Sequence, residues 1–139
     1  MESKIKHLEM VENIIERMAK NCFTLKGWGI TLIAGIFALS AKSTEQKYVL
    51  VAYIPILVFW FLDSYYLQIE RKYKILYKNI SAKSESEIDF DMDTNNIIIT
   101  ESVAKKLCYF RCLFSVTEWL FYCPTLVAIT ILIRILNVF

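Results

Sequence analysis

Apolar residues along the chain gather into three runs, each long enough to cross a membrane. Residues 22–41 and 48–67 each approach the ~20 residues that ~30 Å of hydrocarbon requires. Residues 109–134 form the third run, and between Leu113 and Ile133 its only charge is Glu118. This pattern predicts an all-α membrane protein with three transmembrane helices in one domain, residues 1–139.

Two of these runs are joined to amphipathic segments. Residues 1–21 place apolar side chains on one helical face but carry too much charge to span a membrane. After residue 67, an apolar seam with spacings of four and three continues the second helix without Gly or Pro. The seam consists of Leu62, Tyr66, Ile69, Tyr73, Leu76 and Ile80. We expect both extensions to pair as a cytoplasmic helical stalk, with the seam packed either on its neighbour or on another subunit.

Residues 68–108 are expected to form the cytoplasmic connection to the third helix. Within it, residues 81–101 leave the helical pattern, and Asp89, Asp91 and Asp93 alternate with apolar residues, which predicts a short strand or a loop. The Asp-x-Asp-x-Asp spacing resembles the beginning of a calcium loop. However, Thr94 and Thr100 replace the Gly and Glu that such a loop needs, so we predict no metal site.

Basic residues near the membrane ends indicate the orientation. Lys42 and Lys47 flank the link between the first two helices, and many more basic residues lie on the opposite side. These are Arg17, Lys20, Lys26, Arg71, Lys72, Lys74, Lys78, Lys105, Lys106 and Arg111. The positive-inside rule therefore places the N-terminus and residues 68–108 in the cytoplasm.

The sequence does not indicate an enzyme. It has one histidine, His7, and its four cysteines form no C-x-x-C pair. It also lacks a glycine-rich phosphate loop and a nucleophile elbow. We predict no catalytic residues, no cofactor and no metal.

A polar stripe on the third helix is the first candidate for a functional site. Its residues are spaced four and three apart and share one helical face, which becomes apolar toward the outer end. They are Arg111, Ser115, Glu118, Tyr122, Thr125, Ile129 and Leu132. In a homo-oligomer this face would line a pore, with Ile129 and Leu132 as a hydrophobic gate. Oligomerisation is required because three helices are too few to enclose a channel.

Ion pairing offers a structural alternative for the same region. A carboxyl group inside a membrane needs a partner or a water-filled cavity, and Glu118 can pair with Lys26 or Arg111. Asp63 lies at the equivalent depth on the second helix and can also accept a hydrogen bond from Lys26. The residues alone leave both the pore and the ion pair open.

Small residues on the first helix form a candidate packing face. Gly27, Thr31 and Gly35 are four apart, a spacing that lets two helix backbones approach closely in lipid. The partner is either the second helix of the same chain, which we favour, or the first helix of another subunit.

Basic residues beyond the second helix form a candidate ligand site. They are Arg71, Lys72, Lys74 and Lys78, joined by Lys105 and Lys106 before the third helix. Repeated around the axis of an oligomer, they would attract a nucleotide or a single-stranded oligonucleotide. Contact with the head groups of anionic membrane lipid is the alternative.

Three residue clusters resemble a known family. They are Leu25-Lys26-Gly27-Trp28 with Thr31-Leu32; Phe59-Trp60-x-Leu62-Asp63-x-Tyr65-Tyr66-Leu67-x-x-Glu70-Arg71; and Phe114-Ser115-x-Thr117 with Phe121-Tyr122-x-Pro124. They resemble small three-helix bacterial inner-membrane proteins that look like antiphage-defence membrane effectors of the Hailong type. The resemblance implies an oligomeric channel held shut by a nucleic-acid-like signal, which a partner nucleotidyltransferase makes.

Two functions from different classes follow. The first is an oligomeric ion channel of the bacterial inner membrane that serves antiphage defence and is gated by a cytoplasmic nucleotide or oligonucleotide. The alternative is a non-conducting membrane anchor or scaffold that recruits a soluble partner.

Overall fold

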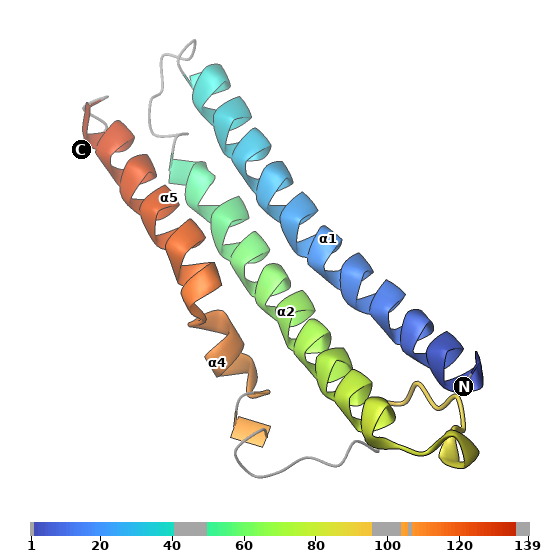
Figure 1. The fold of residues 1–139 in the computed structure, drawn as a ribbon. Helices are drawn as coiled ribbons and strands as arrows, with labels where there is room; N and C mark the ends of the chain where they lie inside the picture. Colours follow the sequence, from blue (N-terminus) through green and yellow to red (C-terminus); the bar gives the residue numbers. More distant parts are fainter. Residues whose placement is uncertain (1, 41–49, 96–103, 106, 136–139) are drawn as a thin grey trace.

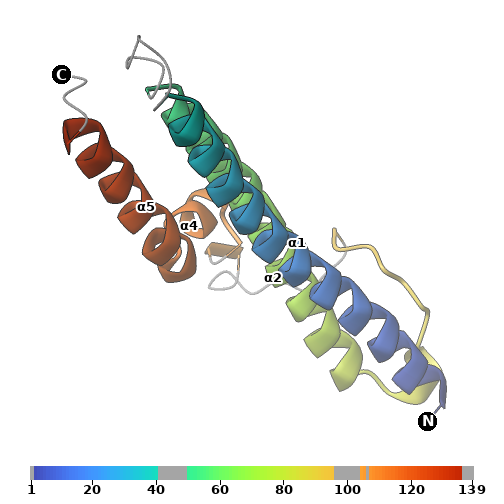
Figure 2. The same cartoon turned by 90° about the horizontal axis from the view of Figure 1, so that it is seen from above.

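The computed structural model describes residues 2–40, 50–95, 104–105 and 107–135, and within them the protein is helical, without a strand. The elements are α1 (Glu2–Ser40), α2 (Tyr53–Ala82), the 3₁₀ turn η2 (Glu85–Glu87), α4 (Tyr109–Leu113) and α5 (Val116–Ile135). Helices α1 and α2 run antiparallel, and α5 lies against the half of α2 nearest its N-terminus (Figure 1). The α1–α2 pair extends well beyond α4 and α5 toward the N-terminus of the chain (Figure 2).

Three helices are long and apolar enough to cross a membrane, which confirms the predicted fold class at this level. They are α1, the helix from Leu50 to Ala82, and α5. Helix α1 is unbroken over 39 residues, a length of about 58 Å. The amphipathic residues 2–21 and the apolar residues 22–40 are thus two halves of one helix. Because this helix is roughly twice as long as the hydrocarbon core is thick, only one half of it fits inside a membrane.

The apolar core of the membrane half joins all three long helices. Its buried members are Ile33, Ile56, Tyr122, Ile129 and Ile133. At Gly29 the backbone of α1 lies directly against the side chain of Phe59: a Cβ atom at this position would lie 3.5 Å from the Phe59 ring. Gly29 therefore serves as the small residue at which α1 meets α2.

The paired extensions of α1 and α2 have a second core. Val11 of α1 is buried against Leu76 and Ile80 of α2, and Leu8, Ile15 and Tyr73 pack around them. The C-terminal half of the predicted seam (Tyr73, Leu76 and Ile80) thus packs on the neighbouring helix of the same chain. This is the first of the two partners expected for the seam, the other being another subunit. At the other end of the seam Leu62 is exposed.

The segment after α2 folds back over this second core. Lys4 Nζ donates hydrogen bonds of 2.8 Å to the carbonyl oxygens of Ser81 and Lys83 and so caps the end of α2. Ile88 and Met92 pack on the core. Of the two structures expected here, the described residues 88–95, which follow η2, form a loop rather than a strand. Residues 96–101 lie outside the described part of the chain.

The acidic residues of this loop bind its own backbone. The carboxylates of Asp89, Asp91 and Asp93 each accept a hydrogen bond from the amide two residues further on, at 3.2, 2.8 and 2.8 Å. The amide of Asp91, and then Lys83, hold the pKa of Asp89 below its ordinary value. Hydrogen bonds from Ser84 likewise lower the pKa of Glu87. These groups shape the loop, and no three potential metal ligands cluster in the described residues.

The third membrane segment is not the single helix that its apolar run predicts. Helix α4 ends at Leu113 and α5 begins at Val116, so the break falls at Phe114–Ser115. Trp60 Nε1 donates to the Leu113 carbonyl at 3.0 Å, which gives a partner to a backbone group that the break leaves free. Helix α5 continues through Pro124.

Candidate functional site

Three ionisable side chains, one from each long helix, meet inside the membrane half of the fold. Lys26 of α1 forms an ion pair with Asp63 Oδ2 of α2, and its Nζ lies 3.3 Å from Glu118 Oε1 of α5. The Asp63 and Glu118 side chains are 0% and 1% exposed, and Lys26 is 17% exposed. We call Lys26, Asp63 and Glu118 the ionic cluster.

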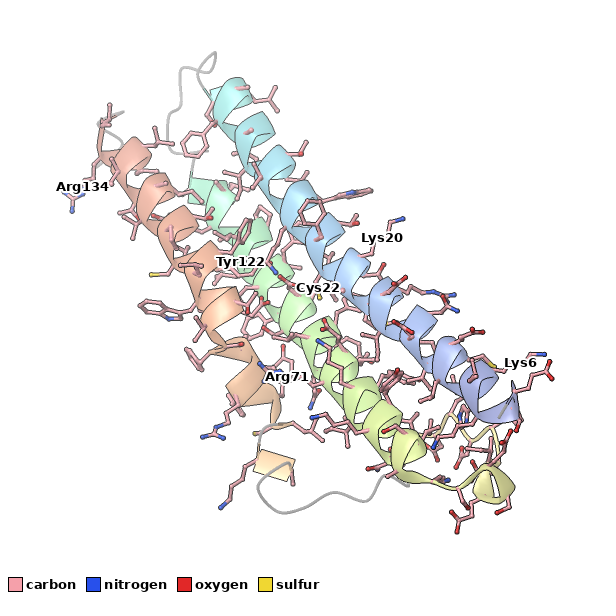
Figure 3. The ribbon with its side chains drawn as sticks, in the orientation of Figure 1. Lys6, Lys20, Cys22, Arg71, Tyr122 and Arg134 are labelled. Carbon is pink, nitrogen blue, oxygen red and sulfur yellow. The ribbon has the colours of Figure 1, made fainter. Side chains whose placement is uncertain are left out.

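Aromatic side chains of α2 and α5 pack around the ionic cluster. Tyr122 donates its hydroxyl to Asp63 Oδ2 at 3.1 Å, and its ring stacks on Trp60 at 5.8 Å between centroids. The ammonium of Lys26 lies 5.7 Å from the centroid of the Phe121 ring and 5.9 Å from that of Tyr122. Figure 3 shows Tyr122 pointing from α5 toward α2.

The ionic cluster contains more acid than its base can satisfy. One carboxyl oxygen on each acid, Asp63 Oδ1 and Glu118 Oε2, is buried without a hydrogen-bond partner among the residues described. Lys26 and Asp63 would by themselves make a neutral pair, so Glu118 is the surplus group. An unsatisfied buried carboxyl is costly, and ionisable groups within membrane helices commonly mark functional sites.

The polar stripe of the third helix divides into inward and outward residues. Glu118, Tyr122 and Ile129 are buried within one chain, while Ser115 and Thr125 are half-buried. Arg111 and Leu132 are exposed. Of the three structural pairings considered from the sequence, the structure shows Lys26–Asp63 and Lys26–Glu118. A pore lined by the buried residues would require the helices of one chain to separate.

The small residues of α1 do not pack where we favoured. A Cβ atom at Gly27 or Gly35 would meet no atom within 4 Å, and Thr31 is exposed, its hydroxyl bonded to the Gly27 carbonyl at 2.9 Å. Our prediction that this face packs on the second helix of the same chain is thus wrong, because Gly29 lies at the contact with α2. Packing against another subunit stays a prediction for this outward face.

Side chains of α2 hold α4 in place, a function that sequence reasoning missed. Gln68 Nε2 donates to the Leu107 carbonyl at 2.8 Å, and Arg71 donates to Ser115 Oγ at 2.8 Å. Arg71 also contacts Cys112 Sγ at 3.5 Å. The charge of Arg71 pointed to a ligand site, and nothing in the pattern indicated that it bridges two helices.

The basic residues expected to bind a ligand are partly brought together. A groove of about 560 Å³ runs between α2 and the α4–α5 break, and we call it the basic groove. It is lined by Arg71, Lys74, Lys78 and Arg111 with Ile75, Leu107, Phe114, Ser115 and Val116. Lys105 lines a neighbouring hollow, Lys72 is half-buried outside the groove, and Lys106 lies outside the described residues.

Within the described residues the protein is all-helical, and three of its helices are long and apolar enough to span a membrane. This indicates a membrane protein. Comparison with family models, curated proteins and solved structures gives no match. The motif resemblance stated above therefore rests on its quoted residues alone.

Proposed function

We propose that the protein is the subunit of a homo-oligomeric ion channel in the bacterial inner membrane, with its N-terminus in the cytoplasm, and that it acts as an antiphage-defence effector. The observation that supports a channel is the surplus carboxyl of the ionic cluster. Packing three helices needs no second acid beside Lys26 and Asp63. A carboxyl exposed to an aqueous path through the membrane attracts cations.

In this proposal the structure corresponds to a closed state. Glu118 and Tyr122 are buried, and Ile129 and Ile133 seal the layer beyond them. Opening moves α5 away from α1 and α2, so that Glu118 exchanges Lys26 for water and faces the pore. The exposed Gly27–Gly35 face of α1 joins subunits. The paired extensions form the cytoplasmic stalk, where a nucleotide or oligonucleotide from a partner nucleotidyltransferase acts as the gating ligand.

Single-channel recording of the purified protein in planar bilayers tests the proposal. We expect cation-selective currents, and Glu118→Gln should lower the selectivity while the amide oxygen keeps its contact with Lys26. Glu16→Gln, on an exposed part of α1, is the matched control and should conduct like the original protein. Bilayers that remain sealed at all potentials, with and without oligonucleotide, would refute the channel.

The second candidate, a non-conducting anchor or scaffold, has its own support. One carboxyl oxygen of Glu118 and the hydroxyl of Tyr122 are bonded within one chain, as in a purely structural helix bundle. Expression in bacteria separates the two functions. Loss of membrane potential that Glu118→Gln weakens supports the channel, whereas harmless expression with a co-purifying soluble partner supports the anchor.

A further inference from the structure

The basic groove lies at the N-terminal end of α5, a helix long and apolar enough to cross a membrane. Helix α5 has 20 residues and so spans about 30 Å, the thickness of the hydrocarbon core. Arg134 lies in its last turn and points outward at one end (Figure 3). Ser115 and Val116, at the opposite end, line the groove. With α5 as the membrane span, the groove lies at the depth of lipid head groups.

The charges of the groove favour an anion. Its lining includes four basic side chains and no acidic one. Lys74 is paired with Glu70, and Arg71 is bound to Ser115. Lys78 and Arg111 are exposed, and within the part of the chain that the structure describes neither the ammonium of Lys78 nor the guanidinium of Arg111 has a hydrogen bond or an ion pair. Two cations are thus available to an incoming ligand beside two that are already held in place.

The groove continues into an apolar hollow. This second hollow, of about 290 Å³, is lined by Phe114, Val116, Trp119 and Leu120. Phe114 and Val116 belong to both hollows. These side chains are strongly exposed, with Val116 80% and Leu120 73% accessible. A cationic site therefore opens directly onto an apolar wall that runs along α5 toward the membrane interior.

We propose that the basic groove binds the phosphate of an anionic phospholipid, with an acyl chain lying along Trp119 and Leu120. The order of the two surfaces matches the order of a lipid, since the charged groove is at the membrane surface and the apolar hollow is deeper. A soluble phosphate ester would use the groove but leave the hollow empty. This site does not depend on the proposed channel.

Native mass spectrometry of the detergent-solubilised protein tests the site with defined probes. We expect phosphatidylglycerol to bind more tightly than zwitterionic phosphatidylcholine. The double variant Lys78→Gln/Arg111→Gln should bind phosphatidylglycerol about 30-fold more weakly, from the usual contribution of two basic residues near an anionic membrane. Lys20→Gln/Arg134→Gln removes the same charge away from the groove and should bind like the original protein, provided that circular dichroism shows equal helix content in both variants.

Two further probes identify the source of the phosphate. Glycerol 3-phosphate has the phosphate without acyl chains and should neither bind detectably nor displace the lipid. Efficient displacement by this ester would overturn the lipid assignment in favour of a soluble anion. A short single-stranded oligonucleotide that binds the original protein but not Lys78→Gln/Arg111→Gln, with lipid binding unaffected in that variant, would assign the groove to nucleic acid instead. Equal lipid binding in the two double variants would also overturn the proposal.

Discussion

Replacing Lys26 by methionine tests whether the ionic cluster holds the three helices together. Methionine keeps the length of the side chain but removes the ammonium that contacts both Asp63 and Glu118. Both carboxyls then remain buried without their cation. The same replacement at Lys20, which is exposed on α1 and points away from α2 (Figure 3), changes net charge equally and is the control.

The expected loss follows from burial. Removing one partner of a buried ion pair costs about 3–5 kcal/mol, because a charge is left uncompensated. We expect the lower end, about 3 kcal/mol, since Asp63 keeps its hydrogen bond from Tyr122. Lys26→Met/Asp63→Asn removes one of the stranded acids and should recover part of the loss. Glu118→Gln alone should cost less than Lys26→Met, because the Lys26–Asp63 pair survives.

Equilibrium unfolding in mixed detergent and dodecyl sulfate, followed by far-ultraviolet circular dichroism, measures these differences. Lys20→Met should unfold like the original protein. If Lys26→Met is equally stable, or if adding Asp63→Asn to it lowers stability further, the ammonium does not compensate the two acids and the argument from burial is wrong.

Two other predictions concern the packing of the helices. Trp60→Phe removes the donor to the Leu113 carbonyl and should cost about 1–3 kcal/mol in the same unfolding assay; an unchanged midpoint would show that the break at residues 114–115 needs no partner from α2. Gly29→Leu should destabilise the single chain, because it forces α1 away from Phe59, whereas Gly35→Leu should leave that stability unchanged and lower only the oligomer yield on size-exclusion chromatography. Equal effects of the two leucines on both measurements would contradict the assignment of separate faces.

The spans were predictable because hydropathy is a property of local sequence. Residues 22–40 and the membrane part of α2 are apolar for the length that a bilayer requires. The helical spacing of Leu76 and Ile80 predicted the apolar face that packs on Val11. The pairing of Lys26 with Asp63 was also accessible, since both lie about one turn or two inside their spans and have opposite charge.

Other features depend on neighbours that the local pattern does not show. The break at Phe114–Ser115 is stabilised by Trp60 and Arg71, which lie far away in sequence. The face of small residues at Gly27 and Gly35 is recognisable in the sequence, but the rotation of α1 about its axis decides which face meets α2. In the structure Gly29, not Gly27 or Gly35, lies at the contact with α2. The loop at Ile88–Met92 likewise follows from packing on the core between α1 and α2 and not from its strand-like alternation.

The break also divides the third segment into two helices that have different attachments to the rest of the fold. Helix α4 is fastened to α2 through the Leu113 carbonyl and through Tyr109, whose hydroxyl donates to the Phe61 carbonyl at 2.8 Å. Helix α5 has separate attachments, the ionic cluster and the 2.9 Å contact between Tyr53 and Thr130. Because the helix is interrupted at Phe114–Ser115, we expect this point to act as the hinge if α5 moves away from α1 and α2, a kind of motion that takes microseconds to milliseconds.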